Sequence, residues 1–166
     1  MLLSRSNLKN IQAPGVILPD ENIFSLPEKV LQFGTGVLLR GLPDYFIDKA
    51  NRLGIFNGRI VVVKSTDSGS TSAFDDQDGL YTLAVKGIEN TVKIEETIIN
   101  AAISRVLSAS KEWDEILACA RNPGMQIVIS NTTEVGIQLV KEDKIESKPP
   151  VSFPGKLLAF LAERYK

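Results

Sequence analysis

Two glycines, Gly34 and Gly36, have the spacing of a phosphate-binding turn. They follow the apolar run at 30–33 and precede a helical pattern. In a dinucleotide-binding fingerprint the first glycine makes a tight turn, the second lets backbone approach a pyrophosphate, and the next helix supplies N–H donors. The full fingerprint has a third glycine where this chain has Leu39, and Arg40 follows as a possible positive charge for the phosphates. The pattern predicts dinucleotide binding, with a structural turn and another phosphate ligand as alternatives.

A second group of polar residues follows the β-branched run at 59–64. An acidic residue near this point holds the adenosine ribose in an NAD site, and Asp67 comes about two residues late for that role. Lys64 and Thr66 would instead tolerate a 2′-phosphate. We predict that Ser65, Thr66 and Asp67 lie on the ribose side, with a solvated strand end as the alternative.

A third polar group, Asn131 to Glu134, follows the apolar run at 125–130. Ligands of open α/β sheets bind at the carboxyl ends of the strands. The group therefore predicts a loop that faces the cofactor or the substrate. A polar turn that caps the next element explains the same residues.

The composition excludes several kinds of site. The chain of 166 residues has no histidine, so it contains no histidine-based triad and no histidine-ligated metal. It has one cysteine, Cys119, which we interpret as a small packed residue. Its 19 basic and 20 acidic residues give a net charge of −1, which argues against nucleic-acid binding through a basic field. No apolar run approaches the roughly 20 residues of a membrane span, and we expect a cytoplasmic protein without a membrane partner.

Alternation and helical spacing predict the elements that position these groups. Strand 30–33, a helix after Pro43 with Phe46, Ala50 and Leu53 on one face, and strand 59–64 make one βαβ unit. Residues 80–95 predict an antiparallel hairpin, with 87–90 between its strands. The pattern at 97–107 fits a helix or a strand equally well.

The second half predicts two helices around a buried strand. The first helix has Ser110 as N-cap and an apolar face that includes Trp113, and the strand spans 125–130. After a surface loop at 141–150, Ser152 caps the last helix. Its apolar stripe consists of Leu157, Leu158, Leu161 and Tyr165. We predict an α/β fold with a mostly parallel sheet and an added antiparallel hairpin, incomplete at the C-terminus because the helical pattern still runs at Lys166.

Four segments together resemble one branch of a known family. They span 31–41, 77–82, 130–137 and 153–157, and they resemble motifs of the tagaturonate reductase (altronate oxidoreductase) branch of the mannitol dehydrogenase family. The match covers 30–166 in the right order. One departure lies in the glycine loop, where the branch usually has Asn and Phe and this chain has Val37 and Leu38.

The resemblance implies a Rossmann-type domain of an NAD-dependent oxidoreductase that interconverts D-tagaturonate and D-altronate. It implies an irregular extension at 1–29, a truncated NAD(P)-binding domain at 30–166, and a helical domain, absent from this chain, that holds the catalytic lysine and most contacts to the keto sugar acid. The fragment itself is then inactive, with no catalytic residue and no metal. The alternatives are a fructuronate reductase, a mannitol or polyol dehydrogenase, and a stand-alone NAD(P)-binding module.

NAD is the favoured cofactor, with NADP as the alternative. The predicted cofactor contacts come from three segments: Phe33, Gly34, Thr35, Gly36, Val37, Leu38, Leu39 and Arg40; Ser65, Thr66 and Asp67; and Asn131, Thr132, Thr133 and Glu134.

Overall fold

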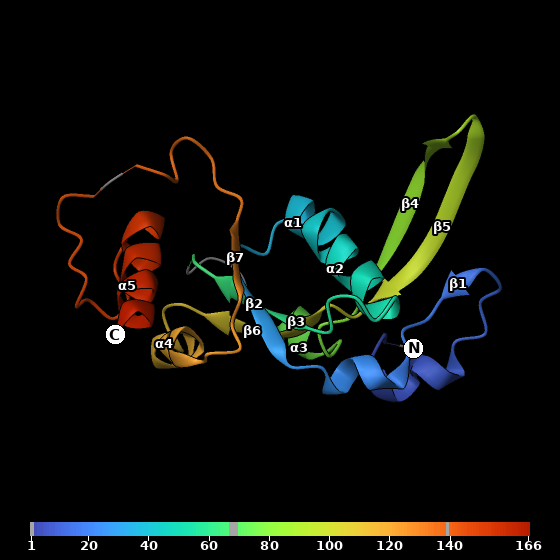
Figure 1. Ribbon diagram of the computed structural model, residues 1–166, viewed down its shortest axis with the longest axis horizontal. Helices are drawn as coiled ribbons and strands as arrows, with labels where there is room; N and C mark the ends of the chain where they lie inside the picture. The colour runs from blue at the N-terminus through green and yellow to red at the C-terminus, as the bar shows by residue number, and fades with distance from the viewer. Residues whose placement is uncertain (1, 67–69, 139) are drawn as a thin grey trace.

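The computed structural model describes residues 2–66, 70–138 and 140–166, and its centre is a four-stranded parallel sheet (Figure 1). The strands lie in the order β6-β3-β2-β7. Their bounds are β2 Glu28–Phe33, β3 Arg59–Lys64, β6 Ile103–Ser108 and β7 Ile127–Ser130. Numbered along the chain within this sheet, that order is 3-2-1-4, the order in which a Rossmann sheet begins. The predicted mostly parallel α/β fold is confirmed.

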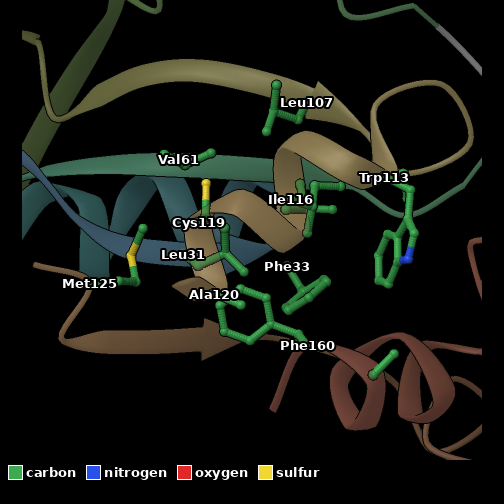
Figure 2. Close-up of a cluster of buried hydrophobic side chains, with 13 residues drawn as sticks. Leu31, Phe33, Val61, Leu107, Trp113, Ile116, Cys119, Ala120, Met125 and Phe160 are labelled. Carbon is green, nitrogen blue, oxygen red and sulfur yellow. The ribbon is translucent and has the colours of Figure 1, made fainter. Parts of the chain in front are cut away.

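One face of this sheet carries the main apolar core, shown in Figure 2. Helices α4 (Trp113–Arg121) and α5 (Phe153–Tyr165) cover it. Phe33 of β2 meets Phe160 of α5 edge to face, with ring centroids 6.3 Å apart. Cys119 packs here as predicted, and burial raises the pKa of its thiol. Burying an aromatic side chain such as Phe160 contributes about 1.5–3 kcal/mol to the free energy of unfolding.

The opposite face is covered by α2 (Pro43–Arg52), which follows the short helix α1 (Val37–Gly41). The helix after Pro43 is confirmed, but the predicted apolar face is not the packed one, and Ile47 is the apolar residue of α2 that packs against the apolar cluster on this face. Phe46 is 56% exposed, whereas Asp44 and Asp48 are fully buried. The reason is that polar side chains of α2 bond to backbone groups, as when Asp48 Oδ1 accepts from the N–H of Ala101 at 2.9 Å.

The hairpin is confirmed, but it lies in its own sheet. Strands β4 (Tyr81–Glu89) and β5 (Val92–Asn100) pair antiparallel, and β1 (Val16–Ile17) joins β5 in the order β1-β5-β4. The ribbon projects from the rest of the chain (Figure 1). Its turn is formed by Asn90 and Thr91, both with positive φ, and not by 87–90 as predicted. A turn with positive φ at both central residues matches the twist of the two strands. Because the turn lies at Asn90 and Thr91, Gly87 is part of β4.

The segment at 1–29 contains more structure than the sequence predicts. It includes 3-10 helical turns at Arg5–Asn10 and Glu21–Ser25. Outside this segment, the short helix α3 spans Ser72–Asp75. Leu8 and Ile23 pack with Leu80 and Ile99 in a third apolar cluster. This segment is therefore attached to the base of the hairpin by burial.

The predicted buried strand at 125–130 is instead an exposed edge. Ile127 and Val128 of β7 are 38% and 37% exposed, because no described strand pairs beyond β7. The undecided region at 97–107 is strand, divided between β5 and β6. In the part of the chain that the structure describes, no helix has the length and apolar character that crossing a membrane requires.

Two predictions about helix starts have different outcomes. Ser152 caps α5 as predicted, since its Oγ accepts from the N–H of Gly155 at 3.1 Å. Ser110 does not cap α4, whose N-cap is Glu112. The Glu112 carboxylate accepts from the N–H of Ser108 at 2.7 Å, which closes a turn before the helix begins.

Most of the predicted apolar stripe of α5 lies on the exposed side of the helix and not against the core. Leu158, Leu161 and Tyr165 are exposed, and Leu157 packs only partly against the core. The buried residues of this helix include Lys156 and Phe160. The helix faces the sheet with a short apolar strip that includes Ala159 and Phe160.

Candidate functional site

A cleft of about 610 Å³ lies at the carboxyl ends of β2, β3 and β7. The long connection between β7 and α5 arches over this end of the sheet (Figure 1). The strand ends contribute Phe33, Gly34, Thr35, Lys64, Ser65, Thr66, Ser130, Asn131 and Thr132. The connection and α5 contribute Val135, Gly136, Gln138, Val140, Val151, Ser152, Phe153 and Lys156. All three polar segments singled out in the sequence therefore reach one cleft.

The glycine turn is fixed by its backbone. Gly34 has φ +120°, which L side chains rarely adopt, and its N–H donates to the carbonyl of Val63 at 2.9 Å. A Cβ at Gly34 would lie 3.0 Å from Leu39 Cδ1. Gly36 is different, because a Cβ there would meet nothing within 4 Å. The space beside Gly36 is open to an approaching ligand.

The end of β3 brings a cation and a hydroxyl to the cleft. Lys64 is buried, and its Nζ donates to the carbonyl of Thr66. The Ser65 Oγ is buried and has no hydrogen-bond partner within the described residues. A buried hydroxyl without a partner costs free energy, which a polar ligand in this cleft would recover. Asp67, the predicted ribose contact, lies outside the described residues.

The end of β7 brings part of the third predicted group to the cleft. Asn131 and Thr132 line it, whereas Thr133 and Glu134 are not among its lining residues. The Thr133 Oγ1 accepts instead from the N–H of Gly136 at 3.3 Å. Thr133 thus shapes the turn that follows the strand.

Lys156 of α5 also lines the cleft and is not among the residues predicted from the sequence. It is 5% exposed, and its Nζ donates to the carbonyl of Val151 at 2.7 Å. Asp143 fixes this start of the helix by accepting from the N–H of Val151 at 2.6 Å and from the Ser152 hydroxyl, which holds the pKa of Asp143 below its usual range. The signal was present, since Lys156 lies within the segment 153–157 that carries the family resemblance.

The described lining of the cleft includes Lys64 and Lys156 but no Asp or Glu. The Asp143 carboxylate, outside this lining, interacts electrostatically with Lys156 and offsets part of its charge. Both lysine side chains are nearly excluded from water, and charge is screened less there than at the surface. The cleft is suited to an anionic ligand such as a phosphate.

The remaining residues of the glycine segment lie away from the cleft lining. Val37 and Leu38 are exposed, and Leu39 is buried against Gly34. The Arg40 guanidinium lies 5.7 Å from the ring centroids of both Phe74 and Tyr81. Gly36 is the N-cap of α1 and is also outside the lining. The structure brings Gly34 and Thr35 to the cleft and does not bring Arg40.

Comparison with curated proteins finds altronate oxidoreductases. The chain is 40% identical over 142 residues to the one from Halalkalibacterium halodurans and 40% identical over 140 residues to the one from Bacillus subtilis. The resemblance to this branch is confirmed. The alignments cover 85% and 84% of the chain but only 28% and 29% of these altronate oxidoreductases. No protein-family model matches the chain.

Comparison with solved structures finds dehydrogenases of the same fold. A Pseudomonas fluorescens mannitol 2-dehydrogenase, in a ternary complex with NAD and D-mannitol, superimposes with a TM-score of 0.84 at 22% identity. A D-sorbitol dehydrogenase in substrate-free form gives a TM-score of 0.78 at 19% identity. Each superposition covers 99% of this chain and 36% of the other. At these identities the likeness establishes the fold.

Proposed function

We propose that this chain is the nucleotide-binding part of an NAD-dependent oxidoreductase. The observation that carries the proposal is the convergence of three strand ends on one cleft beside the glycine turn, in a sheet with the first four positions of the Rossmann order. The mannitol 2-dehydrogenase with the same fold is described with NAD. Bound NAD would supply hydride transfer, and the chain would supply binding and orientation.

The residues of the cleft fit a dinucleotide. Gly34 turns the backbone sharply, and the open space at Gly36, just outside the lining, would admit a phosphate close to the main chain. Lys64 and Lys156 supply positive charge, and the Ser65 hydroxyl is a polar group without a partner in the described structure. NAD is the favoured cofactor, and Lys64 at the end of β3 keeps NADP as the alternative.

The proposed reaction of the whole protein is the interconversion of D-tagaturonate and D-altronate. The 40% identity to altronate oxidoreductases supports this choice over a fructuronate reductase or a mannitol or polyol dehydrogenase. We place the protein in the cytoplasm, with NAD(H) and a keto sugar acid as its partners and with neither nucleic acid nor membrane among them.

We further propose that the catalytic lysine and most substrate contacts lie in a helical domain beyond residue 166. Residues 1–29 would be an N-terminal extension, and 30–166 a truncated cofactor-binding domain. Two exposed apolar surfaces support this division: the edge strand β7, and the outer side of α1 and α2 that includes Leu42, Phe46 and Leu53. Apolar surfaces of this kind commonly pack against further structure. The chain alone is then inactive.

Calorimetric titration of the chain with NADH and with NADPH tests the proposal. We expect saturable 1:1 binding that is weakened in Gly36→Ala, because the added methyl fills the space that the phosphate needs. Gly41→Ala is the matched control, since a Cβ at Gly41 also meets nothing within 4 Å. Equal affinities of both variants and the parent chain would contradict this site. NADH binding alone does not distinguish a fragment of an oxidoreductase from a stand-alone NAD(P)-binding module. The inactivity of the chain is tested separately, because turnover of tagaturonate by the chain would contradict it.

A further inference from the structure

A buried carboxyl group lies directly behind the glycine turn. Asp44 of α2 is fully buried and faces Gln32, which is also fully buried near the carboxyl end of β2. The Gln32 Nε2 is 3.4 Å from Asp44 Oδ2 and 3.3 Å from the carbonyl oxygen of Gly34. The amide of Gln32 therefore connects the carboxyl group of Asp44 to the turn.

In this pair, each side chain has one oxygen atom that accepts no hydrogen bond among the described residues. Neither Gln32 Oε1 nor Asp44 Oδ1 has a hydrogen-bond partner within residues 2–66, 70–138 and 140–166. Both atoms are acceptors when Asp44 is ionised, so neither can satisfy the other. A proton on Asp44 supplies the missing donor. A carboxylic acid and a primary amide can then form two hydrogen bonds side by side.

The charged groups around Asp44 do not provide another solution. Arg40 of α1 is the cation that acts on it, but no ion pair joins the two among the described residues, and the Arg40 Nε is itself buried without a partner. Asp48, one turn along α2, already accepts from Arg52 Nε at 2.6 Å. Tyr81 of β4 donates its hydroxyl to the carbonyl of Arg40 at 2.8 Å.

Burial decides the protonation of Asp44. Desolvation raises the pKa of Asp44 to about 7, against the opposing effects of the Gln32 hydrogen bond and the Arg40 charge. The neutral acid is the form that satisfies both orphaned oxygens, so the geometry and the desolvation favour the same state.

We propose that Asp44 is held as a neutral acid that donates from Oδ1 to Gln32 Oε1, and that this acid–amide pair positions the Gly34 carbonyl and with it the glycine turn. Asp44 is a positioning residue, because it acts through Gln32 and does not line the cleft. When Asp44 loses its proton, Gln32 loses one of the two bonds that orient its amide. The effect on NADH binding rests on the proposed function, but the protonation of the pair does not.

The pH dependence of unfolding tests the pair without any cofactor. The folded chain retains the Asp44 proton to about pH 7 while the unfolded chain loses it near pH 4, so stability falls as the pH rises between these values. We expect the folding constant of the parent chain, divided by that of Asp44→Asn, to fall about tenfold per pH unit in this window. The asparagine keeps a neutral donor for Gln32. With no histidine in the chain, no imidazole titrates in the same range.

Asp48→Asn is the matched control, since Asp48 is equally buried on the same helix but is paired with Arg52. It should lower stability and retain the slope between pH 4 and pH 7. If Asp44→Asn does not fold, the carboxyl ¹³C shift of Asp44 in the parent chain gives the midpoint directly. A midpoint near 7 supports the pair, whereas a midpoint near 4, or a pH-independent stability ratio, overturns it.

NADH titrations at pH 6 and pH 8.5 test the positioning role. We expect the affinity of the parent chain to fall roughly fivefold or more between these pH values, an ordinary size for coupling between two sites, while that of Asp44→Asn stays constant. A sloped stability ratio with identical affinities at both pH values overturns the positioning role. An absence of NADH binding at every pH would instead overturn the proposed function and leave the stability result to decide the pair.

Discussion

The two faces of the parallel sheet are held by different forces. On the α4/α5 face the contacts are apolar and include Phe33, Trp113 and Phe160 (Figure 2). On the α2 face a small apolar cluster is accompanied by Asp44 and Asp48, which bond to other side chains and to the backbone. Apolar burial stabilises without strong directionality, whereas hydrogen bonds fix one geometry. The face that positions the glycine turn is thus the directional one.

The polar side of α2 satisfies backbone groups beside β1, β3 and β5. The Asn51 amide exchanges two hydrogen bonds with the backbone of Gly58, at 2.7 and 3.0 Å. Arg52 donates to the carbonyls of Leu18 at 2.7 Å and Ile99 at 2.8 Å. Buried backbone groups require partners, and no apolar helix face could provide them here. The helix is therefore tied to the turn before β3 and to the base of the hairpin.

The largest expected effect lies on the apolar face. Phe160→Ala should lower the free energy of unfolding by about 3–5 kcal/mol, because it leaves a cavity beside Phe33 in the apolar core. Urea denaturation followed by Trp113 fluorescence measures it. Leu158→Ala on the same helix is the control, since Leu158 is 58% exposed and should change stability by at most about 0.5 kcal/mol. Equal losses for both variants would contradict the assigned face of α5.

On the polar face, Asp48→Ala should cost about 3 kcal/mol. It leaves Arg52 without its carboxylate and the N–H of Ala101 without its acceptor. A double-mutant cycle with Arg52→Met separates the pair from the backbone bond. If Asp48→Ala were neutral in urea denaturation, hydrogen bonding would not be what holds α2 to the sheet.

In the cleft, Lys156→Met should weaken NADH binding roughly tenfold, the value of one charge-assisted hydrogen bond. Methionine keeps the apolar stem but loses the bond to the Val151 carbonyl, so the melting temperature should fall and the titration is run well below it. Lys141→Met removes an exposed lysine of the preceding loop and should leave the affinity as it is. Fluorescence titration with NADH compares the two, and a similar fall in both would show a general charge effect and not a local contact.

The smallest effect is expected on the outer side of α2. Phe46→Ser should change the free energy of unfolding by no more than about 0.5 kcal/mol, because Phe46 is 56% exposed and its ring contact is with the neighbouring Tyr45 of the same helix. Thermal unfolding of the chain measures it. A loss above about 2 kcal/mol would mean that the apolar side of α2 is the packed one after all.

The sequence predicts those elements whose residue types favour a single conformation. The β-branched run at 59–64 is found as β3, buried throughout, and the turn at Gly34 follows β2 as predicted. The packed sides of α2 and α5 could not be read in this way. Both helices have an apolar and a polar side, and the partner decides which one is buried. Asp44 and Asp48 are buried because backbone groups and Gln32 face them, which spacing does not reveal.

The residues of the candidate site also divide into those that the sequence predicts and those that it does not. Gly34, Ser65 and Asn131 are found because parallel strands end at the same edge, so polar residues after each strand meet. Lys156 comes to the cleft through a long connection whose path no local pattern specifies. Arg40 shows the converse, since its place in the sequence suggested the phosphates and its guanidinium lies with Phe74 and Tyr81.

The central claim is that NAD binds where β2, β3 and β7 end. Amide chemical-shift mapping of the ¹⁵N-labelled chain during titration with NAD tests it most directly, because every backbone N–H reports its own surroundings. We predict shifts concentrated at Gly34, Thr35, Ser65, Asn131 and Lys156, with the hairpin tip at Asn90 unchanged. Shifts that gather on the hairpin, or a spectrum that saturating NAD leaves unaltered, would contradict it.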